Sequence, residues 1–162
     1  MGMQYDVKSY HASGSSLAYG ARARLKGIII SPTTSTTYNP AVADTVGGLS
    51  GTYDIPGSTT CTVTITNHGL TNGDRVALNF TSGTGVDDCY TVANVTTNTF
   101  TVTTASLTTS GNVTMYPRIL TEIDCASGTS FYTLIPGEGI LATGGIFCLL
   151  PDSVVTMTIF YG

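Results

Sequence analysis

The two histidines are the first residues to consider for catalysis, because imidazole exchanges protons near neutral pH. His68 lies in a turn-like run, residues 67–70, and His11 is followed by three serines within residues 13–16. Neither histidine has an identifiable nucleophile with a third orienting group, and the Gly-x-Ser-x-Gly pattern is absent. We expect His68 to fix its turn by a ring-to-backbone hydrogen bond, and residues 13–16 to form a flexible break between strands. On this basis the chain is predicted not to be an enzyme.

Acidic residues and cysteines are the candidate metal ligands. Asp87 and Asp88 are adjacent and Asp74 is nearby in sequence, but calcium takes about six to eight oxygens, usually from a spaced acidic loop. The spacing of that loop is missing here, so a solvated turn is predicted. The four cysteines include no CxxC pair, which argues against zinc, and they are expected to be thiols. Whether Cys61 lies close to Cys89 is open. No metal or cofactor is predicted.

Basic residues cluster near the start of the chain. Residues 1–30 carry four cations against one acid, a balance of +3, and the remainder carries two cations against nine acids, a balance of −7. Arg22, Arg24 and Lys26 alternate with apolar residues, which would place all three cations on one face of a strand. They either solvate an edge strand and block its pairing, or contact acidic groups on a neighbouring subunit. So few cations argue against a nucleic-acid partner.

Residues 136–139, Pro-Gly-Glu-Gly, contain two glycines but have neither the spacing of a phosphate-binding loop nor a following helix. We expect a turn that exposes Glu138 to a basic group. The candidate partner-binding residues are therefore Arg22, Arg24, Lys26 and Glu138.

The composition of the 162-residue chain favours a β-protein that works within an assembly. Charged residues make up only 10%, against a usual value of about 25%. The polar surface must come from Thr, Ser, Asn and Gly, and Thr and Val suit a pleated, half-buried surface. The sequence shows neither a signal-peptide pattern nor an apolar run of about 20 residues, so folding in a cytosol and no membrane partner are expected.

Period-two patterns run through the chain, and no segment has helical spacing. Residues 28–30 form an apolar run that is expected to be covered on both faces. Residues 31–58 are expected to be loop-like, with any short strands among them not placed by the pattern. Strands are predicted over residues 17–30, 60–66, 75–80, 89–95, 100–103, 113–123, 131–135, 140–141, 146–150 and 154–161.

These patterns predict an all-β fold of two parts. Residues 1–54 and 113–162 are expected to form a discontinuous β-sandwich base. Residues 55–112 are expected to form a small β-barrel-like domain inserted into one of its loops, because insertions are tolerated where loop ends lie close together.

The middle of the chain resembles a known module. The resemblance rests on four short sequences: His-Gly-Leu at 68–70, Gly-Asp-Arg-Val at 73–76, Tyr-Thr-Val at 90–92 and Asn-Thr-Phe at 98–100. They resemble the small FCCH-like (ubiquitin-activating-enzyme-type) β-barrel repeats of phage tail and head proteins. The resemblance implies a decorative or spacer domain and no ubiquitin chemistry.

The flanks resemble a second family, the small β-sandwich virion structural proteins of marine and cyanobacterial tailed phages. This resemblance rests on residues 5–9, 22–28, 135–141 (Ile-Pro-Gly-Glu-Gly-Ile-Leu) and 155–162. The resemblance implies a capsid cement or decoration protein on the outer shell of the virion, which stabilises contacts between coat subunits. Its partners would be the major capsid protein and itself, as a homo-oligomer for which we expect a trimer. The inserted module is a departure from that family.

An alternative prediction is a tail- or fibre-associated protein that binds a host-surface glycan. Aromatic side chains on an exposed β face would form its binding surface, and the available residues are Tyr10, Tyr19, Tyr38 and Tyr53.

Overall fold

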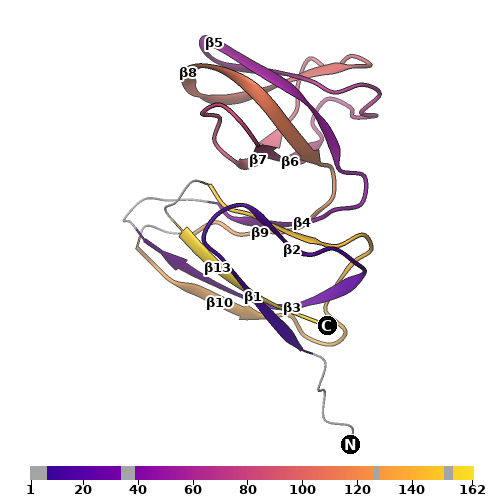
Figure 1. The fold of residues 1–162 in the computed structure, drawn as a ribbon, viewed down its shortest axis with the longest axis vertical. Helices are drawn as coiled ribbons and strands as arrows, with labels where there is room; N and C mark the ends of the chain where they lie inside the picture. The colour runs from indigo at the N-terminus through magenta and orange to yellow at the C-terminus, as the bar shows by residue number, and fades with distance from the viewer. Residues whose placement is uncertain (1–6, 34–38, 126–127, 152–154) are drawn as a thin grey trace, which may run out of the picture. The chain divides into compact units, whose positions relative to one another are not determined.

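The computed structural model describes residues 7–33, 39–125, 128–151 and 155–162 (Figure 1). In these residues the secondary structure consists of antiparallel strands, turns and bridges without a helix, so the predicted all-β class is confirmed. The chain divides into two compact units. Unit 1 comprises Met1–Val46 and Leu120–Gly162, and unit 2 comprises Gly47–Ile119.

Unit 1 is a sandwich of two sheets. The first sheet has the order β1-β13-β3-β10, with β11 also paired to β3, and the second has the order β2-β12-β4-β9. The strands are β1 (Lys8–Ala12), β2 (Ser16–Tyr19), β3 (Ala23–Pro32), β4 (Ala41–Asp44), β9 (Ile119–Glu122), β10 (Phe131–Leu134), β11 (Ile140–Ala142), β12 (Ile146–Leu149) and β13 (Val155–Tyr161).

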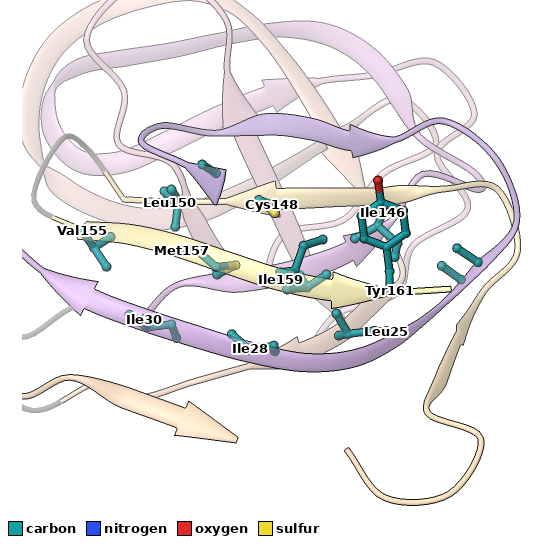
Figure 2. Close-up of a cluster of buried hydrophobic side chains, with 14 of the residues drawn as sticks. Leu25, Ile28, Ile30, Ile146, Cys148, Leu150, Val155, Met157, Ile159 and Tyr161 are labelled. Carbon is teal, nitrogen blue, oxygen red and sulfur yellow. The ribbon is translucent and has the colours of Figure 1, made fainter. Parts of the chain in front are cut away.

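The core of unit 1 lies between these two sheets. As its period-two pattern predicts, β13 turns Val155, Met157, Ile159 and Tyr161 to one buried face (Figure 2). Side chains of β3 and β12 meet them from both sheets. Burial of each such side chain contributes about 1.5–3 kcal/mol. This packing fixes which residues of the first sheet point outward.

A β-bulge interrupts the alternation of β3. Phe160 pairs with Gly27 and the next residue, Tyr161, pairs with Leu25, so Lys26 is an extra residue on β3. Beyond the bulge, residues 28 and 30 face the core and Ile29 faces outward with 38% of its surface exposed. The expectation that residues 28–30 are covered on both faces is therefore wrong.

The single strand predicted over residues 17–30 is two strands in two different sheets. β2 ends at Tyr19, and β3 begins at Ala23 in the other sheet. The chain crosses between the sheets over residues 20–22, and Arg22 lies in this connection, just before β3. The three cations therefore do not all stand on one strand.

Residues 31–58, expected to be loop-like with any short strands unplaced, contain β4 (Ala41–Asp44) and the start of the long strand β5 (Leu49–Thr64). β4 is completely buried, and β5 begins at Leu49. The turn residues of this segment flank a strand of only four residues, too short for alternation to reveal it. Pro56 lies where β5 has a register shift, the kind of position at which a strand tolerates proline. Residues 34–38 lie outside the described part of the chain.

Unit 2 is one curled sheet of order β5-β8-β6-β7, formed by β5 (Leu49–Thr64), β6 (Arg75–Phe80), β7 (Asp88–Thr91) and β8 (Thr99–Tyr116). The far end of β8 pairs with β6, and a bridge joins Ala93 to Thr101 near its start. This sheet encloses its own core without closing into a barrel. The predicted boundaries at 54/55 and 112/113 fall inside β5 and β8, which are continuous strands.

Candidate partner-binding surface

The outer face of the first sheet, which points away from the core, brings together three of the four predicted residues. Arg24 and Lys26 flank the buried Leu25 on β3 and so project outward. The ammonium of Lys26 donates to the Glu138 carbonyl oxygen at 2.9 Å. The Arg24 Nε lies 3.6 Å from a Glu138 carboxylate oxygen. We call Arg22, Arg24, Lys26 and Glu138 the basic cluster.

The turn that carries Glu138 has a steric reason to lie here. Gly139 adopts a left-handed backbone conformation (φ +77°), and a Cβ at this position would collide with the Leu25 carbonyl oxygen. The Arg24 guanidinium also lies 3.5 Å from the Gly139 carbonyl oxygen. Glycine therefore lets the turn approach β3 closely, which holds Glu138 beside the two cations.

The basic cluster retains a positive excess. It holds three cations against one carboxylate, a balance of +2. The Glu138 side chain is 84% exposed, so its ion pair with Arg24 contributes only about 0–1 kcal/mol. Arg22 and Arg24 line an open pocket of about 240 Å³ together with Leu141. The surface suits acidic groups on a partner better than it suits internal pairing.

Apolar side chains lie beside the basic cluster on the same face. Tyr132 is 77% exposed and Leu134 is 73% exposed, both on β10 at the end of the first sheet. Tyr132 pairs with the exposed Ile29, so both side chains stand on the outer face. We call Ile29, Tyr132 and Leu134 the apolar edge. The sequence predicted this strand but gave no sign that it ends a sheet.

The His68 ring fixes its turn as predicted. The Leu70 N–H donates to His68 Nδ1 at 3.1 Å, and the ring meets Phe100 edge-on with centroids 5.2 Å apart. The side chain is only 8% exposed, and in the part of the chain that the structure describes Nε2 has no hydrogen-bond partner. The ring is thus a packed element of the unit 2 core.

Residues 13–15 lie in the break between β1 (Lys8–Ala12) and β2 (Ser16–Tyr19), where a break was predicted. The Ser15 hydroxyl donates to the Leu150 carbonyl at 3.2 Å and accepts from the Leu150 N–H at 2.9 Å, which secures this corner against the second sheet. His11 stands on β1, where Nδ1 lies 2.9 Å from the Thr158 hydroxyl. Ser15 and His11 therefore have different hydrogen-bond partners, and each stabilises a different contact of unit 1.

The aspartates considered for calcium fix their own backbone segments. Asp87 accepts from the Phe80 N–H at 2.6 Å, and Asp74 accepts from the Thr71 N–H at 2.8 Å. Asp88 accepts from the N–H of the next residue at 2.7 Å. Within the described residues, no three His, Cys, Asp or Glu side chains are grouped so that they could hold a metal ion.

Asp44 is the polar residue that the sequence did not single out. It is completely buried at the end of β4, and its carboxylate accepts hydrogen bonds from the Val46 and Gly144 N–H groups and from both donors of Thr143, at 2.7–3.1 Å. Burial opposes ionisation, but these hydrogen bonds outweigh it and lower the Asp44 pKa from 3.8 to about 2. Asp44 therefore ties two loops of unit 1 together as a carboxylate.

The four cysteines are buried thiols that form no disulfide. Burial raises the pKa of the Cys148 thiol to about 12, and burial together with the Asp54 charge raises that of Cys61 to about 11. Because the thiolate is the reactive form, these thiols are poor nucleophiles. In the described part of the chain, no helix has the length and apolar character needed to cross a bilayer.

The tyrosines proposed for glycan binding are largely engaged inside unit 1 or unit 2. Tyr53 is 3% exposed, and Tyr19 packs against Tyr161 with ring centroids 5.1 Å apart. Tyr10 is half-buried and its hydroxyl donates to Ser16, while Tyr38 lies outside the described residues. Tyr132 is the exposed aromatic side chain that the sequence analysis missed.

Comparison with known proteins gives few matches. No family model and no curated protein matches the chain. Among solved structures, the chain is similar to the Phage phi92 endosialidase with a TM-score of 0.32 and 21% identity, over 80% of this chain and 20% of that chain. The chain thus spans about a fifth of that protein's length. The FCCH-like module and the specific virion family remain predictions.

The same comparison corrects the expectation that the chain is not an enzyme. The similar structure is named as an endosialidase, which is an enzyme. The absence of a recognisable motif was weak ground for excluding catalysis in an all-β chain, and the exclusion is withdrawn. At this level of similarity the comparison assigns no activity either.

Proposed function

We propose that the protein is a structural component of a tailed-phage particle, and more specifically a capsid cement or decoration protein. The observation that carries the proposal is the outer face of unit 1, where the basic cluster lies beside the apolar edge. Exposed apolar groups rimmed by charged groups are typical of protein-binding surfaces.

The two parts of this surface have different roles in binding. Burial of Tyr132 and Leu134 supplies free energy at about 25 cal/mol per Å² of apolar area. The cations of the basic cluster select a partner with acidic groups and speed its association. The major capsid protein on the outer shell of the virion is the proposed partner, with assembly in the host cytoplasm.

Unit 2 is proposed to act as a decorative or spacer domain. It has a core of its own, centred on Phe100 and Met115, so it does not need a partner to bury its apolar side chains. This role agrees with the resemblance of residues 68–100 to phage FCCH-like modules.

The test is sedimentation of the purified full chain with mature particles of the phage that encodes it. We expect saturable binding that weakens as salt concentration rises, because the cations contribute to recognition. Cryo-EM of the decorated particles would then locate the added density on the outer shell. Failure of the chain to sediment with particles at any salt concentration would contradict the proposal.

A tail- or fibre-associated glycan-binding protein is the second candidate. It is favoured by one observation, the 77% exposure of the Tyr132 ring on the outer face, because aromatic rings at binding surfaces pack well against partly apolar ligands. Density confined to the tail, together with specific binding on a glycan array that is lost in Tyr132→Ala, would replace the capsid proposal with this one.

A further inference from the structure

We propose that two copies of the protein form a symmetric dimer by pairing their β10 strands edge to edge. In this dimer the two strands run antiparallel about a two-fold axis at Thr133. The first sheets of the two copies then join into one continuous sheet. The dimer uses Tyr132 and Leu134 of the proposed particle-binding surface, but it is measured on the free protein without particles, so its failure is distinguishable from a failure of particle binding.

The free edge of β10 has backbone groups available for pairing. The Ile135 N–H donates to the Lys26 carbonyl at 2.8 Å, which shows that residue 135 points its backbone groups toward β3. Backbone direction alternates along an antiparallel strand. The N–H and C=O groups of Tyr132 and Leu134 therefore point away from β3, along the free edge.

β10 is short, at four residues, but its edge carries none of the side-chain features that keep sheet edges from pairing. Charged side chains, proline and bulges block most natural edges. Phe131–Leu134 contains no charged residue and no proline, and its pairing with β3 has no register shift. By contrast, β1 at the other end of the same sheet carries Lys8 and His11. One end of the sheet is protected and the other is open.

The exposed side chains select the register. With Thr133 opposite its own copy, each Tyr132 stands opposite the Leu134 of the second copy. Both are edge-facing residues, so the two pairs exchange about four hydrogen bonds. The same register packs the most exposed aromatic side chain on the most exposed aliphatic one, twice. A shift of one pair would instead place Leu134 opposite Ser130.

Charge is compatible with this arrangement. Leu134 pairs with Gly27, so Lys26 lies beyond the C-terminal end of β10. A two-fold axis at Thr133 places the basic clusters of the two copies at opposite ends of the strand pair. Like charges are therefore kept apart across the axis, where direct opposition would be destabilising.

The contact is small, and this sets the expected strength of the dimer. A tyrosine buries about 150–250 Å² when fully covered, so two Tyr132 and two Leu134 side chains bury less than the roughly 1,200 Å² of a standard interface. The dimer is expected to be weak in dilute solution and to form at high local concentration. The proposed dimer is two-fold, whereas a trimer was expected from the sequence, and the oligomeric state measured in solution decides between them.

Disulfide cross-linking tests both the contact and its register. In the proposed dimer the two Thr133 residues face each other at a distance that a disulfide can bridge, whereas the two Tyr132 residues are about 7–8 Å apart. Thr133→Cys should therefore form covalent dimers under mild oxidation about tenfold faster than Tyr132→Cys. The four native cysteines are buried, so they should contribute little background.

A second variant separates pairing from random collision. Adding Leu134→Lys to Thr133→Cys places a charge on the free edge, and it should abolish both the cross-link and the concentration-dependent rise of the sedimentation coefficient. Equal cross-linking of Thr133→Cys and Tyr132→Cys, or cross-linking that persists with Leu134→Lys, would overturn the proposal. So would a chain that sediments as a monomer at every concentration.

Discussion

The two units differ in the kinds of side chain that they expose to solvent. All large apolar side chains that are exposed in the described residues belong to unit 1, and none belongs to Gly47–Ile119. In unit 2 the outward positions of paired strands carry threonine, as in the Thr60–Thr103 and Thr62–Thr101 pairs. The exposed apolar side chains therefore lie on the unit that carries the proposed contact surface.

The units also differ in how they hold their buried polar side chains. Asp44 of unit 1 accepts four hydrogen bonds, one from the nearby Val46 and three from residues 143 and 144, about 100 residues away in sequence. His68 of unit 2 acts within its own turn. Because Asp44 holds these segments in its ionised form, its protonation is expected to weaken unit 1 at low pH.

Removal of the buried Phe100 side chain should destabilise unit 2 and leave unit 1 folded. Phe100 is completely buried, and Phe100→Ala should lower the free energy of unfolding of unit 2 by about 3–5 kcal/mol. Because each unit has its own core, hydrogen exchange measured by mass spectrometry should show lost protection in β5–β8 and retained protection in β3 and β13. Equal loss in both units would mean that they fold as one body.

Alanine substitutions at two glycines of unit 2 test its packing at a single position. Gly83 and Gly69 both have left-handed backbone conformations, in which alanine costs about 1–2 kcal/mol. A Cβ at Gly83 would also meet the Tyr53 hydroxyl, whereas one at Gly69 would meet nothing within 4 Å. Urea unfolding should show a loss of about 3 kcal/mol for Gly83→Ala and about half of that for the matched control Gly69→Ala. Equal losses would contradict this packing.

Acid should weaken unit 1 through Asp44. Its pKa is lowered on folding from 3.8 to about 2, so the ionised form stabilises the fold above about pH 4, and this contribution is lost as pH falls toward 2. Asp44→Asn should lower the free energy of unfolding at pH 7 by about 2.5 kcal/mol and flatten its dependence on pH between these values.

The exposed Asp54 of unit 2 provides the control for this experiment. Asp54→Asn should leave the free energy of unfolding within about 0.5 kcal/mol of the unmodified chain. An Asp44→Asn protein with the same acid unfolding profile as the unmodified chain would contradict the role assigned to the carboxylate.

The apolar edge should matter least for stability and most for association. Tyr132 and Leu134 are mostly exposed, so replacing both with threonine should change the free energy of unfolding of the monomer by no more than about 0.5 kcal/mol. The same variant should remain monomeric at concentrations where the unmodified chain associates, as analytical ultracentrifugation would show. A large loss of stability would mean that these side chains belong to the fold.

Local patterns in the sequence predicted the parts of the fold that depend on local geometry. The alternation of residues 60–66 and 155–161 was confirmed, as was the ring-to-backbone bond of His68. The bulge at Lys26 was missed because it arises from pairing with β13, more than a hundred residues away. Without it, the outward position of Ile29 could not be predicted.

The candidate surface was also predicted only in part, because it depends on contacts between segments that are distant in sequence. Arg24, Lys26 and Glu138 come together as a turn meets a strand, but Arg22 lies in a connection between sheets. The exposure of Tyr132 depends on β10 being the last strand of its sheet, which is a property of the topology. Asp44 has no local signal because two of its partners, Thr143 and Gly144, lie on a distant loop.

The most direct test of the central claim, that unit 1 binds other particle subunits through its outer face, is quantitative sedimentation of the unmodified chain and two variants with particles. Arg24→Glu combined with Lys26→Glu reverses the basic cluster, and Arg75→Glu reverses an exposed arginine on β6 of unit 2. The account predicts that the double variant binds at least about tenfold more weakly, while Arg75→Glu binds like the unmodified chain. Equal binding by all three proteins, or loss of binding in Arg75→Glu alone, would contradict it.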